Sequence, residues 1–183
     1  RIPAITLPLL RSADIRALEA SYASAEPPLM ERAGAALAGR AAELAAGGPV
    51  LIAAGPGNNG GDGLVAARLL QEQGIAVTVV LAGDAQGLPR DARAAYEGWR
   101  QIGGQIHSDI PPGSYALAVD ALFGIGLTRP LAGRHTALID ALEALSCPIL
   151  AVDVPSGLCA DTGRCLGRCL HASHTLSLIA GKP

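Results

Sequence analysis

A glycine-rich stretch, Gly-Pro-Gly-Asn-Asn-Gly-Gly-Asp-Gly at residues 55–63, separates a short apolar run from a segment with helical periodicity. This order predicts a strand, a loop and then a helix. Gly55, Gly57 and Gly60 fit the spacing G-x-G-x-x-G, in which backbone N–H groups approach a phosphate at the start of a helix. We therefore predict an anion-binding loop. The alternative is a tight turn in which glycine is needed for a positive φ.

Strand-length apolar runs alternate with helical patterns along the rest of the chain. Strands are expected at residues 49–54, 75–81, 115–119, 149–152 and 175–179, and helices at 11–22, 28–46, 62–73, 89–102 and 134–145. Such alternation requires crossover connections, which give parallel strands covered by helices on both faces. Because only 3% of the residues are aromatic while 50% are hydrophobic, the core must consist of Ala, Val, Leu and Ile. The prediction is an α/β fold, a Rossmann-like three-layer α/β/α sandwich with a mostly parallel, doubly wound sheet, formed by one domain over residues 1–183.

The composition argues against two classes of partner. The 14 basic and 16 acidic residues leave a net charge of −2 without a basic run, so we expect no nucleic acid to bind. No apolar stretch approaches the roughly 18 residues of a membrane span, and the first residues lack the apolar region of a signal peptide. The expectation is a cytoplasmic protein that does not contact a membrane.

Four cysteines and two histidines gather in the last third of the chain: Cys147, Cys159, Cys165, Cys169, His171 and His174. A zinc site is one interpretation of this cluster. The spacing contains no Cys-x-x-Cys pair of the usual structural kind, so we interpret the cysteines as reduced thiols.

Two acidic residues follow two of the expected strands. Asp120 comes directly after residues 115–119, and Asp153 directly after residues 149–152. Ligands of doubly wound sheets bind beyond the carboxyl ends of the strands. Two carboxylates there could hold a cation, act as general acid and base, or divide these roles. The alternative for each is a turn residue that satisfies backbone donors.

Further polar residues surround these two positions. Asn58, Asn59 and Asp62 are not explained by phosphate binding; amide and carboxylate oxygens suit a hard cation, whereas Asp62 could instead cap a helix that starts at Gly63. The Gly-x-Gly loop after Asp120 ends in Arg129, whose planar guanidinium could close over a phosphate.

Taken together, these loops resemble the YjeF N-terminal domain family, the NAD(P)H-hydrate epimerases. The motifs that carry the resemblance are residues 29–34 (Leu-Met-Glu-Arg-Ala-Gly), 55–63, 119–126 (Val-Asp-Ala-Leu-Phe-Gly-Ile-Gly), 152–157 (Val-Asp-Val-Pro-Ser-Gly) and 174–183. They occur in the family's order over nearly the whole chain. The family domain usually continues past the lysine that Lys182 matches.

The resemblance implies a substrate and a reaction. The substrate is NADH or NADPH hydrated at C6 of the nicotinamide ring (NADHX or NADPHX), and the enzyme interconverts its R and S forms. A dehydratase that uses the S form is the implied functional partner. In proteins where the two are fused, a chain like this one is the N-terminal part of a bifunctional protein. A homodimer is also implied.

The resemblance also assigns residues. Substrate binding falls to Asn58, Asn59, Gly60, Gly61, Asp62, Gly124, Ile125, Gly126, Leu127, Thr128, Arg129, Pro130 and Asp153, and a potassium ion (K+) to Asn59, Asp120 and Ser156.

A mechanism follows as a hypothesis from the chemistry of a hydroxyl-bearing carbon next to a ring nitrogen. Asp153 protonates the leaving hydroxyl, the nitrogen electron pair forms a planar iminium, and Asp153 accepts a proton from the water that returns. Lys182 could tune the local charge.

Two other functions remain open. An oxidoreductase would need an acid after the second strand to bind ribose, and only Asp84 lies near that position. A catalytically inactive nucleotide-binding scaffold would keep the fold, but it would not need Asn59, Asp120 and Asp153 together.

Overall fold

The computed structural model describes residues 8–183. Its elements are α1 (Ser12–Ser21), α2 (Leu29–Ala45), β1 (Val50–Ala54), α3 (Asn58–Glu72), β2 (Val77–Leu81), the 3-10 helix η1 (Ala85–Gly87), α4 (Arg90–Gln101), β3 (Ile106–His107), β4 (Leu117–Ala121), α5 (Arg134–Glu143), β5 (Ile149–Val152) and β6 (His174–Leu176). Among the described residues, no helix combines the length and the apolar character that crossing a lipid bilayer requires.

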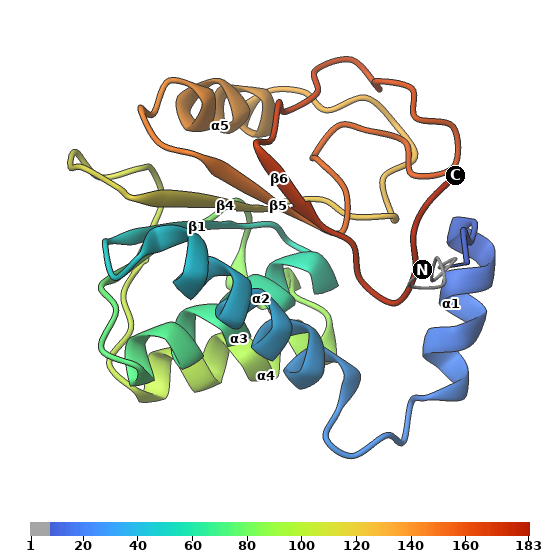
Figure 1. Ribbon diagram of the computed structural model, residues 1–183, viewed down its shortest axis with the longest axis horizontal. Helices are drawn as coiled ribbons and strands as arrows, with labels where there is room; N and C mark the ends of the chain where they lie inside the picture. The colour runs from blue at the N-terminus through green and yellow to red at the C-terminus, as the bar shows by residue number, and fades with distance from the viewer. Residues whose placement is uncertain (1–7) are drawn as a thin grey trace, which may run out of the picture.

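The six strands form one parallel sheet in the order β3-β2-β1-β4-β5-β6. Helices α2, α3 and α4 cover one face and α5 covers the other, while α1 stands apart beside the carboxyl-terminal segment (Figure 1). The chain winds outward in one direction from β1 and in the other from β4. The predicted doubly wound α/β/α sandwich is confirmed, and its switch point lies between β1 and β4.

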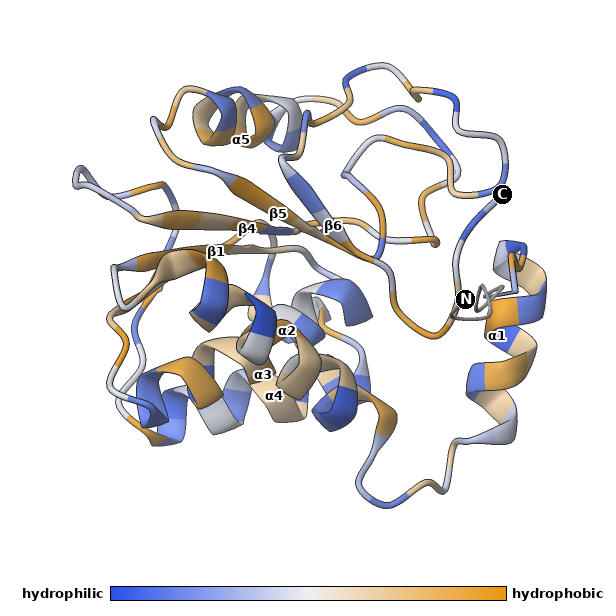
Figure 2. Cartoon of the chain, viewed as in Figure 1, coloured by the Kyte–Doolittle hydropathy of each residue, from blue (hydrophilic) through white to orange (hydrophobic). Residues whose placement is uncertain are grey.

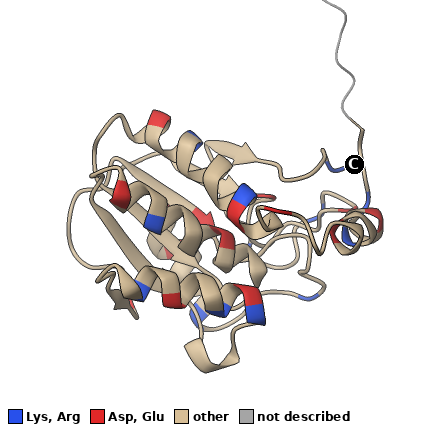
Figure 3. Ribbon diagram, turned by 90° about the horizontal axis from the view of Figure 1, so that it is seen from below, with Lys and Arg blue, Asp and Glu red and all other residues tan. Residues whose placement is uncertain are grey.

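Small and aliphatic side chains fill the core, as the composition predicts. The five residues of β1 and the five of β4 are all buried, and hydrophobic residues concentrate on the strands (Figure 2). Charged residues of both signs are interspersed along the helices on the face seen from below (Figure 3). Glycine permits close packing of the helices: a Cβ on Gly34 of α2 would lie 2.3 Å from Cγ1 of Val65 on α3.

The helix after β1 begins earlier than predicted. It starts at Asn58 rather than Asp62, so that most of the glycine-rich stretch is helical. Asparagine and glycine are poor helix formers, but the absence of side chains lets this turn pack tightly. A Cβ on Gly60 would lie 2.0 Å from the carbonyl oxygen of Gly55, and one on Gly61 would lie 2.6 Å from Cε of Met30.

Two other sequence-based expectations need correction. The two-residue strand β3 carries no apolar run and was not predicted. The last strand ends at Leu176 rather than Ile179: the N–H of Leu178 donates to the side chain of Asp153 and not to a neighbouring strand, and Ile179 has a positive φ of 65°. Ser12 is the first residue of α1, and its N–H and hydroxyl donate to Asp161 Oδ1 at 2.7 and 2.9 Å.

Candidate active site

A cavity of about 380 Å³ opens at the carboxyl ends of β1, β4 and β5, on the α1 side of the sheet. It lies at the switch point, where a doubly wound sheet binds its ligands. Its lining comprises Ile15, Arg16, Glu19, Pro56, Gly57, Asn58, Asn59, Asp62, Leu122, Phe123, Gly124, Ile125, Gly126, Leu127, Asp153, Leu178 and Ile179.

Asp120 lies beneath this cavity, at the end of β4, and is fully buried. Its carboxylate accepts hydrogen bonds from the hydroxyl of Ser156 at 2.6 Å, from the N–H of Ser156 at 2.8 Å and from the N–H of Leu122 at 3.2 Å. Burial raises the pKa of Asp120, while the two hydrogen bonds from Ser156 oppose the rise. Within residues 8–183, no basic side chain pairs with Asp120.

Ser156 connects the turn after β5 to the loop after β4. Its hydroxyl donates to Asp120 and accepts the N–H of Phe123 at 3.0 Å. The parallel pairing of β4 with β5 brings these two turns together, since residues 118–120 pair with residues 149–151. Asp120 and Ser156, predicted to lie in one site, therefore do lie in direct contact.

Asn59 occupies the first turn of α3 and faces the loop after β4. A Cβ on Gly124 would lie 3.0 Å from Asn59 Oδ1 and 3.3 Å from Asp153 Oδ2, so the glycine lets both side chains approach this loop. Nδ2 of Asn59 is buried and has no hydrogen-bond partner within residues 8–183. A buried amide without a partner is costly and favours a bound ligand. A half-turn about the Cβ–Cγ bond of Asn59 would present the amide oxygen to that ligand instead.

Asp153 follows β5 and adopts a positive φ of 70°. Asp tolerates this region better than most residues, yet a left-handed residue beside a cavity is typical of functional sites. Its Oδ1 accepts the ammonium of Lys182 and the N–H of Leu178, the latter at 3.2 Å. The side chains of Asp153 and Lys182 are only 9% and 8% exposed.

Lys182 is held in place by several oxygen acceptors. Besides Asp153, its ammonium donates to Ser177 Oγ at 2.9 Å and to the carbonyl oxygens of Leu178 and Ala180 at 2.9 and 3.0 Å. These contacts fold the segment after β6 against the turn after β5. The ammonium therefore stabilises the negative charge of the Asp153 carboxylate.

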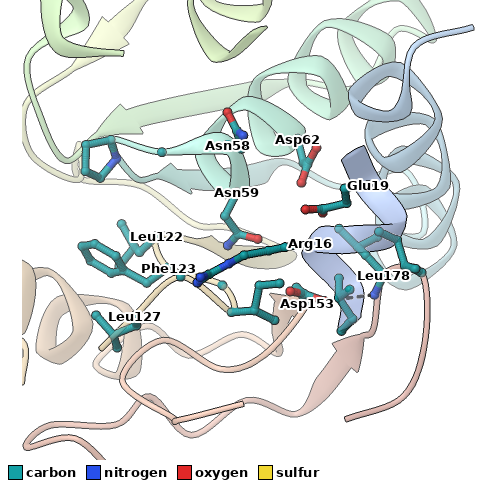
Figure 4. Close-up of a pocket in the computed structure, with 17 residues that line it drawn as sticks. Arg16, Glu19, Asn58, Asn59, Asp62, Leu122, Phe123, Leu127, Asp153 and Leu178 are labelled. Atoms are coloured by element: carbon teal, nitrogen blue, oxygen red, sulfur yellow. Dashed lines mark hydrogen bonds between the residues drawn. The ribbon is translucent and has the colours of Figure 1, made fainter. Parts of the chain in front are cut away.

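Asp62 and Glu19 add two more carboxyl groups to the cavity (Figure 4). Burial raises the pKa of Asp62 to about 8, and the negative charges of Asp153 and Glu19 add to this effect. Burial and the charge of Asp153 also raise the pKa of Glu19, against the opposing charges of Arg16 and Lys182. The alternative interpretation of Asp62 as a helix cap is wrong, because α3 begins at Asn58 behind Gly57.

The predicted substrate-binding residues divide into two groups. Those that line the cavity are Asn58, Asn59, Asp62, Gly124, Ile125, Gly126, Leu127 and Asp153. Those outside the lining are Gly60 and Gly61, which pack inside the first turn of α3, and Thr128, Arg129 and Pro130, which continue the loop after β4.

The glycines of the G-x-G-x-x-G pattern serve the close approach of backbone segments. None of Gly55, Gly57 and Gly60 has a positive φ, so the tight-turn alternative is wrong. A Cβ on Gly55 would lie 1.7 Å from the carbonyl oxygen of Leu122, and this contact brings the ends of β1 and β4 together. Of the three glycines, Gly57 lines the cavity, directly before the amino terminus of α3.

Sequence reasoning missed the contribution of α1. Ile15, Arg16 and Glu19 all line the cavity. One signal was available: Ile15 is the buried apolar residue of this helix, and Glu19, four residues later, lies on the same face. The acid that an oxidoreductase would need is absent from the lining, since Asp84 instead caps η1 by accepting the N–H of Gln86 at 2.9 Å.

Several known proteins are similar to this chain. The NAD(P)H-hydrate epimerase of Bordetella bronchiseptica is 49% identical over 174 residues, which cover 92% of this chain and 76% of that protein. The NAD(P)H-hydrate epimerase of Rhodobacter capsulatus is 46% identical over 167 residues, which cover 84% and 78%. The bifunctional NAD(P)H-hydrate repair enzyme Nnr of Escherichia coli is 44% identical over 135 residues, which cover 73% of this chain but 26% of that protein.

A solved structure supports the fold independently. The crystal structure of yeast ynu0, YNL200c, is 24% identical and superposes with a TM-score of 0.82, covering 97% of this chain and 82% of that one. The family described as YjeF-related protein N-terminus matches residues 26–183, which include every residue discussed around the cavity except those of α1. The chain belongs to this family, as its sequence motifs predicted.

Proposed function

We propose that the chain is an NAD(P)H-hydrate epimerase, an isomerase that interconverts the R and S forms of NADHX or NADPHX in the repair of damaged nucleotides. The observation that carries this proposal is the ion-paired carboxylate of Asp153 in a cavity at the switch point, in a chain 49% identical to proteins named for that activity. The inactive scaffold is disfavoured, because a scaffold gains nothing from a buried charge held beside an open cavity.

The polarity of the cavity suggests an orientation for the substrate. We propose that the nicotinamide ring lies against Asp153 and that the diphosphate extends toward Gly57 and Asn58, where no side chain of the described residues caps the amino terminus of α3. Residues 124–130 form the remaining substrate-binding loop, with residues 124–127 nearest the ring. Gly60 and Gly61 support this arrangement indirectly by letting α3 start beside the loop.

We also propose a potassium site formed by Asn59, Asp120 and Ser156. The residues fit such an ion: within residues 8–183, the fully buried Asp120 carboxylate has no basic partner, and Nδ2 of the buried Asn59 amide has no hydrogen-bond partner. Oxygen donors of these kinds suit a hard monovalent or divalent cation. A bound potassium ion would neutralise Asp120 and hold the turns after β4 and β5 in one arrangement.

The reaction requires proton transfer at the C6 hydroxyl. Loss of this hydroxyl as water, driven by the electron pair of the ring nitrogen, leaves a planar iminium that water can attack from either face. Asp153 is the proposed proton-transfer residue. Its Oδ2 faces the loop that lines the cavity, while its Oδ1 is held by Lys182 and Leu178.

Three finer features are part of the proposal. A dehydratase that consumes the S form is the functional partner; the name of the Escherichia coli relative and its greater length support a fusion in some proteins. A homodimer could form through α1, where Leu18 and Tyr22 are exposed. A cytoplasmic location agrees with four free cysteines.

A coupled assay tests the function. R-form NADPHX is mixed with a separate S-specific dehydratase, and NADPH formation is followed by absorbance with potassium or sodium as the cation. We expect formation to depend on this protein and to increase with potassium. A folded sample that gives no acceleration with either cation would contradict the function, whereas equal rates with both would contradict only the potassium site.

A further inference from the structure

Three carboxyl groups enter the cavity, and two of them, those of Asp62 and Asp153, come from opposite walls (Figure 4). Asp62 projects from α3, and Asp153 projects from the turn after β5. Asp62 is 9% exposed, and no group within residues 8–183 forms a hydrogen bond with its carboxyl. A buried carboxyl group without a protein partner, aimed into a cavity, is available to a ligand.

The surroundings of the two groups differ in charge. Asp153 is in contact with the ammonium of Lys182, a positive charge. The charged groups that act on Asp62 are Asp153 and Glu19, both of them acidic. Burial and these two charges raise the pKa of Asp62 to about 8, so that near neutral pH Asp62 is a carboxylic acid. Two carboxyl groups whose charged surroundings differ in this way are suited to act one as an acid and the other as a base.

Inversion at one carbon makes a specific geometric demand. The hydroxyl must leave from one face of the ring, and water must add to the other face. A single carboxyl group at one face returns water to the face it left, unless the ring or the water moves around it. Groups on opposite walls of one cavity serve both faces of a ring bound between them.

Taking the proposed epimerase function as given, we propose that Asp62 is a second catalytic residue, which acts on one face of the nicotinamide ring while Asp153 acts on the other. In one direction, the carboxylic acid of Asp62 gives its proton to the C6 hydroxyl. The C–O bond breaks, water leaves, and the ring nitrogen electron pair forms the iminium.

Asp153 completes the inversion. Its carboxylate takes a proton from a water molecule on its own face as that oxygen bonds to C6, and the iminium electrons return to nitrogen. Asp62 is then ionised and Asp153 protonated, and exchange with solvent restores the starting state. The reverse reaction uses the same two groups in exchanged roles, so no oxidant, reductant or co-reactant is consumed.

The test compares Asp62→Asn and Asp153→Asn with the wild type and with Glu43→Gln, a control on the outer surface of α2, where Glu43 pairs only with Arg40. Epimers are separated chromatographically, and kcat and KM are measured in both directions, with incorporation of oxygen-18 from labelled water at C6. We expect kcat for inversion to fall at least about 100-fold in each Asn variant with KM changed only a few-fold, and to be unchanged in the control. In the wild type each inversion should introduce one labelled oxygen.

Two further measurements separate catalysis from folding. Asp62→Glu, which keeps the carboxyl group, should recover part of the rate, and the wild-type kcat should fall above about pH 8 as Asp62 ionises. Circular dichroism establishes that each variant is folded. Asp62→Asn with an inversion rate within about threefold of wild type would overturn the proposal and leave Asp153 as the only proton-transfer residue, with the epimerase function intact. A folded wild type without inversion would instead refute the epimerase function and this proposal with it.

Discussion

Asp62→Asn should stabilise the protein in alkaline solution, although it removes a charged residue from the surface of a cavity. Asp62 is 9% exposed, carries no hydrogen bond within the described residues and lies near two other acidic groups. Asparagine has nearly the same size and shape but no charge. The substitution therefore removes the cost of burying a carboxylate and changes little else.

The sign and size of the effect follow from proton binding. The folded protein keeps the Asp62 proton up to about pH 8, whereas the unfolded chain releases it near the ordinary value of 3.8. The free energy of unfolding of the wild type therefore falls as pH rises between these values, and this decrease is complete above the folded-state pKa. Each pH unit is worth about 1.4 kcal/mol, which gives a total on the order of 5 kcal/mol. Water in the open cavity reduces this, so we expect at least about 2 kcal/mol.

Urea unfolding in potassium-free buffer measures this effect. Wild type, Asp62→Asn and the control Glu43→Gln are compared at about pH 4 and about pH 9. The Asn variant should equal the wild type at the lower pH and exceed it at the higher pH, while the control follows the wild type at both. An Asn variant that is less stable throughout, or a difference independent of pH, would refute the reasoning that Asp62 is neutral in the folded protein.

Further substitutions test the packing and the polar contacts of the site. Gly55→Ala should lower the free energy of unfolding by about 3 kcal/mol, because the new Cβ would lie 1.7 Å from a carbonyl oxygen. Gly57→Ala should lower it by under about 1 kcal/mol, because a Cβ there would meet no described atom within 4 Å. Equal urea midpoints for the two variants would contradict this difference. Ser156→Ala removes a buried hydroxyl that both donates and accepts a hydrogen bond, and should lower the free energy of unfolding by about 2 kcal/mol. It should also reduce the amount by which the unfolding temperature in potassium chloride exceeds that in sodium chloride. An unchanged difference between the two salts would argue against Ser156 as a potassium ligand. Lys182→Met leaves the buried Asp153 carboxylate unpaired and should lower the free energy of unfolding by about 3 kcal/mol at neutral pH. Adding Asp153→Asn should recover most of this loss, whereas additive losses in the double variant would contradict the ion pair.

The proximity of Asp120 to the turn at Asp153 could be predicted from the sequence. Each residue follows an apolar run of strand length, and parallel strands end at the same edge of a sheet. The pairing of β4 with β5 brings them together as expected. The ion pair of Asp153 with Lys182 was not predictable, because the segment after β6 has no periodic pattern that fixes its path.

The start of α3 shows where local preference misleads. Residues 58–63 consist of Asn, Asp and Gly, which disfavour a helix interior by up to about 1 kcal/mol each. Tertiary contact decides otherwise: Gly60 and Gly61 permit approaches to Gly55 and Met30 that any side chain would block. The glycine pattern resembles a phosphate-binding loop, but Gly55 and Gly60 lie outside the cavity lining and serve the close packing of backbone segments.

The role of α1 illustrates a different limit. Its periodicity identifies Ile15 as a buried residue, and the structure agrees. Periodicity does not say what the buried face covers, since that depends on contacts such as those of Ser12 with Asp161, which lie 149 residues apart. Arg16 and Glu19 therefore reach the cavity through a placement that no local pattern encodes.

The central claim is tested most directly by following the two epimers themselves. Pure R-form and pure S-form NADPHX are incubated separately with the protein, and the two forms are separated by chromatography over time. We predict that both samples approach the same mixture at a rate proportional to protein concentration, and that Asp153→Asn abolishes this acceleration. Epimers that interconvert no faster than without protein, although the protein is folded and binds them, would contradict the assignment as an epimerase.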